Sequence, residues 1–216
     1  MKPFTTLFYM ARRKAHSSST PHIFIAGLGN APYPSTRHSI GQYIVTSLSK
    51  QLSIPLNSVR GGHMGTGTDP ATGLKITLFK SKQLMNISGP TVVTTFRTTQ
   101  LPADKLVLVY DSLTHAPCKL SPRLGGSHQG HNGVKSVMQS LGGSGKSKPF
   151  WQFRVGVGRG GDKGSIDKSV DAAEWVLGPL SAEEKEYWGV GGEGLESILR
   201  EISRVTAEAE ANDGSS

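Results

Sequence analysis

The sequence is short of cysteine and of long apolar runs. Cys118 is the only cysteine among 216 residues, which excludes an internal disulfide framework and a cysteine-rich metal cluster and indicates a reducing compartment. No apolar run approaches the roughly 20 residues that a membrane-crossing helix needs, so we expect no membrane partner. A hydrophobic content of 36% over this length is enough for one substantial core.

Acidic residues are also scarce over most of the chain. The first 159 residues contain 19 lysines and arginines but only three acidic residues, Asp69, Asp104 and Asp111, whereas residues 160–216 contain five basic and 13 acidic residues. A basic body indicates a polyanionic partner. Nucleic acid is favoured over a membrane because no basic amphipathic helix accompanies the charge. A generally basic, solvated surface is the plainer alternative.

The first 20 residues differ in composition from the rest. They contain four basic residues, several hydroxyls and scattered large apolar side chains, without an acidic residue, as is typical of a mitochondrial transit segment. A disordered basic tail on a cytoplasmic protein is the alternative, because Pro3 and the short apolar run weaken an amphipathic helix. We expect a targeting-like tail over 1–20, an α/β domain over 21–209 and a disordered tail over 210–216, with a mitochondrial location favoured over a cytoplasmic one.

Apolar runs along the domain lead into polar loops and then into amphipathic segments. Residues 60–73, rich in glycine and threonine, are expected to form a loop ending in a turn at Asp69–Gly73. Strands joined by helices predict a single α/β domain with a mostly parallel twisted sheet and helices on both faces. The expected strands are 22–26, 74–80, 105–110 and 151–158, with a last strand and turn at 175–179.

The apolar residues between these runs recur at helical spacing. They predict helices from His38 to about Leu52, from Ser88 to Phe96 and from Val134 to Leu141. Ser181 and Glu184 fit a capping box that opens a closing helix to about residue 209, interrupted at 189–194. This acidic region either faces away from a bound polyanion or closes over the site as a lid.

Polar loops follow the strands, and the loops at the carboxyl ends of parallel strands meet in one crevice. His38 lies where the first loop meets a helix, and histidine is the side chain that exchanges a proton near neutral pH. Asp111 directly follows the clearest strand. The amides of Asn30, Asn86 and Asn132 both donate and accept hydrogen bonds without titrating. The loops therefore predict an acid–base site.

The same loops resemble the signature blocks of a known family. The blocks are Gly27–Asn30, Tyr33, Thr36–His38 with Gly41, Met85–Asn86 with Ser88–Gly89, Asp111, Gly125–Gly126 and Gly130–Gly133. In order and spacing, over roughly residues 22–180, they are similar to those of bacterial-type peptidyl-tRNA hydrolase. The resemblance implies a single-domain monomer that needs no cofactor and hydrolyses the ester bond between a peptide and the 3′ ribose of tRNA.

The resemblance also implies roles for individual residues. His38 would be the general base, oriented by Asp111, with Asn30 and Asn86 in the catalytic set and no metal. Arg123 and Arg154 match positions that bind a phosphate at the end of the acceptor stem, where a planar guanidinium suits the ligand. The alternative is a non-catalytic RNA-binding relative of the same fold. The residues expected to bind the substrate or its 3′ end are Tyr33, Met85, Asn132, Arg123, Arg154 and Lys135.

The sequence departs from the family pattern in several places. Ala31-Pro32 directly precede Tyr33, Ser39 stands where asparagine is usual, and Ser112 stands where an acid is usual. Residues 142–149 and 160–172 resemble insertions. His128 and His131 have the spacing of a metal-binding pair, but no carboxylate or cysteine block accompanies them in sequence, so neither is assigned to the site.

Overall fold

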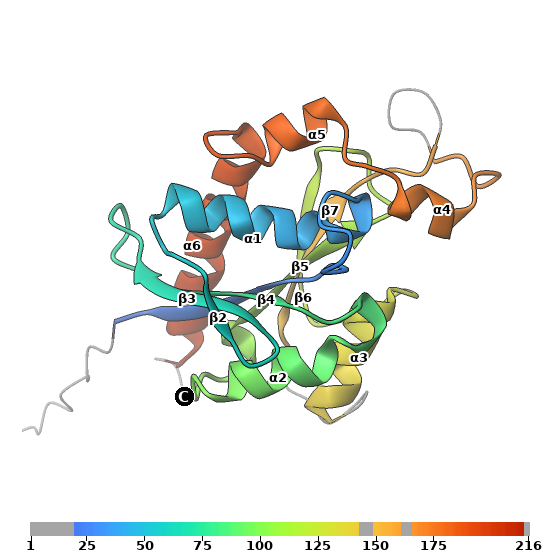
Figure 1. Cartoon of the computed structure of the whole chain (residues 1–216). Helices are drawn as coiled ribbons and strands as arrows, with labels where there is room; N and C mark the ends of the chain where they lie inside the picture. Colours follow the sequence, from blue (N-terminus) through green and yellow to red (C-terminus); the bar gives the residue numbers. More distant parts are fainter. Residues whose placement is uncertain (1–19, 143–148, 161–165, 214–216) are drawn as a thin grey trace, which may run out of the picture.

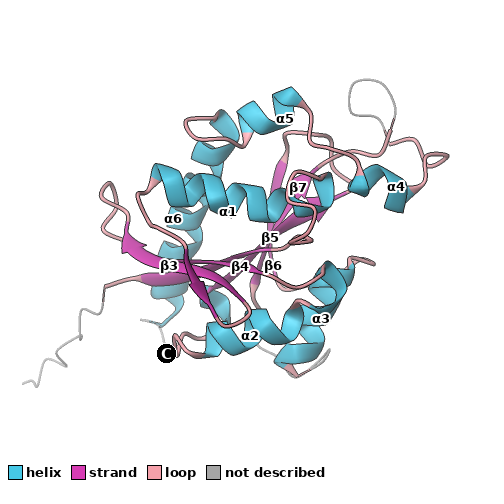
Figure 2. Ribbon diagram, viewed as in Figure 1, coloured by secondary structure: helices cyan, strands magenta, loops and turns pink. Residues whose placement is uncertain are grey.

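The structure, a computed structural model, describes residues 20–142, 149–160 and 166–213. The targeting-like tail, apart from Thr20, most of the expected insertion 142–149 and residues 161–165 of the expected insertion 160–172 lie outside these residues. The chain forms one seven-stranded sheet in the order β2-β3-β4-β1-β5-β7-β6 (Figures 1 and 2). The strands are β1 (His22–Gly27), β2 (Asn57–Val59), β3 (Gly62–Thr68), β4 (Lys75–Ser81), β5 (Leu106–Ser112), β6 (Leu120–Leu124) and β7 (Trp151–Gly156).

The centre of the sheet is parallel. Strands β4, β1, β5 and β7 pair in parallel, whereas β2, β3 and β6 are joined antiparallel at the two sides. The predicted α/β fold is therefore confirmed, and the sheet, predicted to be mostly parallel, is mixed, with three parallel and three antiparallel pairings. Every residue of β5 is buried, as expected for a continuous apolar strand covered on both faces.

Helices cover both faces of the sheet. Helices α1 and α6 pack on one face, and α2 and α3 pack on the other, which gives two apolar clusters separated by the sheet (Figure 1). The helices are α1 (Ile40–Gln51), α2 (Gly89–Arg97), α3 (Asn132–Leu141), α4 (Ala172–Leu177), α5 (Ala182–Tyr187) and α6 (Glu193–Asp213), with short 3-10 turns η1 (Arg37–Ser39), η2 (Met85–Ile87) and η3 (Ala103–Lys105). No helix within the described part of the chain has the length and apolar character to cross a membrane.

The prediction of a loop over 60–73 was wrong, because β3 occupies most of it and pairs along its length with β4. Its glycines serve close packing instead of turning. A Cβ on Gly62 would lie 2.5 Å from the Phe79 ring, and one on Gly65 would lie 2.4 Å from the Pro55 carbonyl oxygen. The predicted turn after β3 is confirmed, since the carboxylate of Asp69 accepts hydrogen bonds from the residues that follow it.

The predicted last strand at 175–179 was also wrong. These residues belong mainly to α4, whose start is capped by the Asp171 carboxylate accepting from Glu174 N at 2.9 Å. Six residues are too few to display helical periodicity, so the pair Val176-Leu177 resembled a strand. The capping box at Ser181 and the break before the closing helix are confirmed. The closing helix runs to Asp213, so residues 210–213 are helical and not disordered.

Two glycines seat α1 on the carboxyl ends of the central strands. A Cβ on Gly41 would lie 2.1 Å from the Val109 carbonyl oxygen, and a Cβ on Gly27 would lie 2.2 Å from the Gly41 carbonyl oxygen. Only glycine permits such an approach. The start of α1, and with it His38 in the preceding turn η1, is therefore held over the junction of β1 and β5.

Candidate active site

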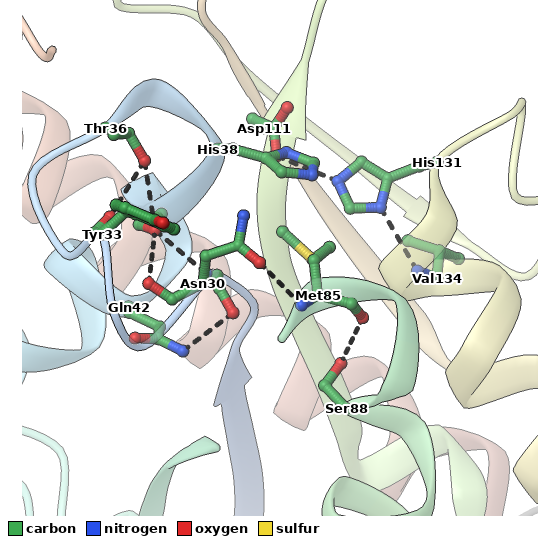
Figure 3. Close-up of polar contacts among 12 residues, drawn as sticks. Asn30, Tyr33, Thr36, His38, Gln42, Met85, Ser88, Asp111, His131 and Val134 are labelled. Atoms are coloured by element: carbon green, nitrogen blue, oxygen red, sulfur yellow. Dashed lines mark hydrogen bonds and ion pairs between the residues drawn. The ribbon is translucent and has the colours of Figure 1, made fainter. Parts of the chain in front are cut away.

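Two histidines share one buried carboxylate at the carboxyl edge of the sheet (Figure 3). Nδ1 of His38 and Nε2 of His131 each lie 2.9 Å from Oδ1 of Asp111. The carboxylate comes from the end of β5, His38 from η1 and His131 from the residue that precedes α3. The side chains of His38, Asp111 and His131 are 17%, 3% and 10% exposed, so the cluster is held in protein and open at His38.

Hydrogen bonding assigns the protons of both rings. Nδ1 of His131 accepts from Val134 N at 3.3 Å, so its Nε2 carries the proton that is donated to Asp111. Nδ1 of His38 likewise donates to Asp111, which leaves Nε2 of His38 as the ring nitrogen with a free lone pair. His38 lines the cavity described below, so this nitrogen is the one available to accept a proton.

His38 and Asp111 shift each other's pKa in opposite directions. Burial alone would lower the pKa of His38, but the hydrogen bond and the charge of Asp111 outweigh it and raise the pKa above its ordinary value of 6.5. Burial alone would raise the pKa of Asp111, but the charges and hydrogen bonds of His131 and His38 hold it well below its usual range. Asp111 is therefore a carboxylate at neutral pH, and it stabilises the protonated form of His38.

Asn30 is fixed by the loops around it. Its Oδ1 accepts from Met85 N at 2.8 Å, which leaves the amide nitrogen to donate, and this nitrogen points toward the side of the site that carries His38 (Figure 3). The buried hydroxyl of Ser39 accepts from Asn30 N at 3.0 Å and donates to Asn30 O at 3.3 Å. Ser39, a departure from the family pattern, thus supports the loop that presents Asn30.

The other predicted residues on this side differ in how far their side chains are exposed to solvent. Asn86 in η2 is exposed, and Tyr33 is 56% exposed on the loop that follows Asn30. Met85 is only 3% exposed, within the cluster that also contains Leu28, so its side chain packs in the core instead of facing a substrate channel. The structure therefore offers Asn86 and Tyr33, but not the side chain of Met85, to a ligand.

A cavity of about 480 Å³ opens beside the histidines. His38, Asp111, His131 and Asn132 line one side, and Arg154 lines it from β7. The remaining wall includes apolar residues of α4, so the acidic end of the chain contributes a fixed wall through α4, whereas α6 packs in the core and is not a lid. Lys135 lies exposed further along α3.

Arg123 and Arg154 lie on one face of the β6–β7 pair. Arg123 pairs with Gln152 and Arg154 with Ser121, which makes the two arginines diagonal neighbours on that face. Arg154 donates to Ser121 Oγ at 2.7 Å, and Arg123 donates to the Ser127 carbonyl oxygen at 2.8 Å. Both residues are partly exposed and Arg154 lines the cavity, so the two form a cationic pair that reaches the cavity through Arg154.

His131 is the residue that sequence reasoning missed. It was set aside because no carboxylate accompanied its metal-like spacing with His128, yet the fold supplies Asp111 from 20 residues earlier. His128 instead accepts from Gly130 N and shapes the loop. The sequence carried no signal for this contact, because the loop follows β6, which runs antiparallel to β7 and ends at the sheet edge opposite Asp111.

The donor atoms of His38, Asp111 and His131 lie within 4.8 Å of one another, and within the described residues this is the one such group that could hold a metal ion. Both nitrogens that face Asp111 are already used as donors to a single carboxylate oxygen. A metal would have to displace both protons, so the hydrogen bonds explain the cluster by themselves.

Known proteins resemble this chain in sequence and in fold. The family model for peptidyl-tRNA hydrolase matches residues 24–213. Peptidyl-tRNA hydrolase from Bacillus pumilus is 36% identical, over 76% of this chain and 82% of its own, and the probable peptidyl-tRNA hydrolase of Mus musculus is 32% identical, over 75% and 76%. The crystal structure of peptidyl-tRNA hydrolase from Acinetobacter baumannii matches the fold with a TM-score of 0.72 at 24% identity, over 90% of this chain and 94% of that one.

The fold defines an α/β protein with a His–Asp–His cluster at the carboxyl ends of its central parallel strands. The family match covers most of the chain, so the chain belongs to the peptidyl-tRNA hydrolase family. Its activity is the hydrolysis of peptidyl-tRNA.

Proposed function

We propose that His38 is the general base of ester hydrolysis and that Asp111 orients and stabilises it. The observation that carries this is the 2.9 Å contact between Nδ1 of His38 and the buried Asp111 carboxylate, which leaves Nε2 facing the cavity side as a proton acceptor. In this mechanism Nε2 takes a proton from water, and the hydroxide formed attacks the ester carbonyl. The tetrahedral intermediate then expels the 3′ oxygen of the ribose, which receives the proton back from the imidazolium.

The asparagines supply the remaining contacts. The amide nitrogen of Asn30, whose oxygen is held by Met85 N, donates to the oxyanion that forms on the carbonyl. Asn132 lines the cavity, and Asn86 is exposed on η2 next to Met85, whose backbone N–H holds Asn30, so both are suited to the peptide backbone and the terminal ribose. His131 donates to the same oxygen of Asp111 as His38 and keeps the carboxylate ionised.

The arginine pair is proposed to bind the RNA. Arg123 and Arg154 present two guanidiniums beside the cavity that contains His38, which suits a phosphate at the end of the acceptor stem while the 3′ end reaches the histidine. Lys135 adds unspecific attraction to the backbone. Recognition of shape and phosphate, and not of bases, lets one enzyme accept many tRNAs.

The test of this mechanism is peptide release from an N-blocked aminoacyl-tRNA by the wild-type chain and by His38→Ala. We expect the variant to bind tRNA normally and to lose cleavage by about 10²- to 10⁴-fold, the usual contribution of a general base. Cleavage by the variant at the wild-type rate would reject His38 as the base. RNA binding without cleavage by the wild-type chain would favour the non-catalytic alternative.

Location and assembly are part of the same proposal. The acid-free, basic and hydroxyl-rich composition of residues 1–20 favours a mitochondrial protein, acting as a monomer on peptidyl-tRNA released during ribosome recycling. Fusion of these residues to a fluorescent protein tests the location, with a cytoplasmic signal rejecting it. Sedimentation of the purified chain tests the monomer.

A further inference from the structure

Arg37, the residue before His38, joins the turn η1 to the acidic end of the chain. Its guanidinium carbon lies 4.1 Å from the centre of the Trp175 ring on α4, and its Nε lies 3.5 Å from Oε2 of Glu184 on α5. The side chains of Arg37 and Glu184 are 15% and 4% exposed, so the charges meet largely out of water. Such a cation over an indole is favourable, most of all where it is desolvated.

Backbone contacts join the same two segments. Arg37 N donates to the Gly178 carbonyl oxygen at 3.0 Å, and Leu180 N donates to the Ser35 carbonyl oxygen at 2.9 Å. A Cβ on Gly178 would lie 3.0 Å from Nη1 of Arg37, so the glycine leaves room for the guanidinium. The loop that carries His38 is thereby attached along several residues to the chain between α4 and α5.

The partners of Arg37 are themselves fixed. Nε1 of Trp175 donates to the Val157 carbonyl oxygen at 3.1 Å, which ties the ring to the end of β7. Oε2 of Glu184 accepts from Ser181 N at 2.7 Å in the capping box of α5. Arg37 therefore docks on two groups whose positions are set by other contacts.

The charge pair is not arranged for the greatest stability. Nε of Arg37 and Oε1 of Glu184 are both buried, and neither finds a hydrogen-bond partner within the described residues. Buried ion pairs with incomplete hydrogen bonding contribute little to stability compared with apolar replacements, and some are retained because they specify one arrangement. This pair fits that second description.

The helix that holds the guanidinium also forms the cavity wall. Ala173, Val176 and Leu177 of α4 line the cavity beside His38, while Trp175 of the same helix carries Arg37. Both elements are short, with six residues in α4 and three in η1, so the position of each depends on its contacts with other elements. One contact thus relates the position of His38 to the wall that the substrate meets.

We propose that Arg37 is a positioning residue that holds the loop of His38 against α4 and α5, so that the histidine and the cavity wall keep one relative geometry. The inference rests on the assignment of His38 as the general base. It adds a residue that touches neither the reacting atoms nor the carboxylate and acts only through its neighbour.

The test compares Arg37→Ala, Arg37→Lys and Glu184→Gln with a matched control, Arg204→Ala. Arg204 on α6 also lies over an indole, 5.4 Å from the centre of Trp151, and pairs with Glu201 and Glu208, but it is remote from η1 in the fold. The readouts are kcat and KM per folded molecule and the pKa of the His38 ring measured by NMR titration in the full chain.

We expect Arg37→Ala to lower kcat by about ten- to 100-fold, the cost of a small misplacement, with a smaller change in KM. The NMR titration should move to lower pH, because a ring that leaves Asp111 keeps the effect of burial without the carboxylate. Arg37→Lys should recover part of the lost kcat and part of the shift in the His38 titration. Glu184→Gln should lower kcat and the His38 pKa less than Arg37→Ala does. Arg204→Ala should leave kcat and the titration unchanged.

The role is overturned if the Arg37 variants lose only thermal stability and retain wild-type kcat and the wild-type His38 titration. Should Arg37→Ala fail to fold, Arg37→Lys and Glu184→Gln carry the same comparison. The titration does not depend on the catalytic assignment. If His38→Ala retained cleavage, the mechanism would fall, while a lowered His38 pKa in the Arg37 variants would still support positioning and an unchanged one would reject it.

Discussion

The histidine cluster and the arginine pair, which reaches the same cavity through Arg154, are built in opposite ways. His38, Asp111 and His131 are largely buried and joined by two contacts of 2.9 Å, with each ring proton assigned by a partner. Arg123 and Arg154 stand on an outer strand pair, partly exposed, with hydrogen bonds that use only part of each guanidinium. Proton transfer requires one fixed geometry, whereas phosphate binding requires charge that solvent and ligand can reach.

The largest effect should come from breaking the buried side of this comparison with Asp111→Asn. Loss of the carboxylate removes both the correct orientation of His38 and the stabilisation of its protonated form, and kcat should fall by about 10³-fold or more. The titration should move as well. His38 must be unprotonated to act, so wild-type kcat/KM falls as the pH drops through a raised pKa, above 6.5.

In Asp111→Asn burial alone remains, so the acid limb of the pH profile should shift to lower pH. A profile measured from pH 5 to 9 checks this. Asp104→Asn is the matched control, since it removes a carboxylate at η3, away from the cavity. If the acid limb of the pH profile is the same in Asp111→Asn as in the wild type, the pH dependence does not arise from His38.

A smaller loss is expected for His131→Asn. The change removes the second donor to Oδ1 of Asp111 but leaves His38 its partner. A hydrogen bond to a charged group contributes about 1.5–3 kcal/mol, so kcat should fall by roughly ten- to 100-fold with little change in KM. Steady-state kinetics measure this loss. The control is His128→Asn, which changes a contact within the loop but leaves the hydrogen bonds to Asp111 in place. Equal losses in both variants would reduce the role of His131 to loop structure.

Arg154→Ala tests the exposed side. Removal of one phosphate contact should raise KM by about tenfold at low salt, leave kcat unchanged and reduce the slope of log binding against log salt by about one. Arg123→Ala should raise KM and reduce the salt slope in the same way. Lys75→Ala, which removes a cation from the first residue of β4, at the other end of the parallel strands, should change neither. A fall in kcat with an unchanged salt slope would place Arg154 in the chemistry instead.

Treatment with a chelator should have no effect on the rate of peptide release. The His–Asp–His cluster satisfies its hydrogen bonds internally, so peptide release should continue at the wild-type rate after exhaustive dialysis against EDTA. Activity that disappears with EDTA and returns with a divalent cation would turn the cluster into a metal site.

The parallel centre of the sheet could be predicted from sequence because buried strands are continuous apolar runs. Strand β3 and helix α4 could not, since the glycines of β3 resemble a loop until their close neighbours are known, and α4 is too short to show a period. His38 and Asp111 could be paired because each follows a strand at the same edge. His131 could not, because its loop follows the antiparallel strand β6 and its ring meets Asp111 only in the folded chain.

The sheet ends at strands that give another chain little to pair with. On one side β6, the last strand in the order, contains Pro122, which lacks the backbone N–H that a further strand would need. On the other side β2 is three residues long. Short or proline-bearing edges discourage edge-to-edge growth between molecules. The fold therefore carries its own protection against aggregation, and one of the protected edges is the strand that holds Arg123.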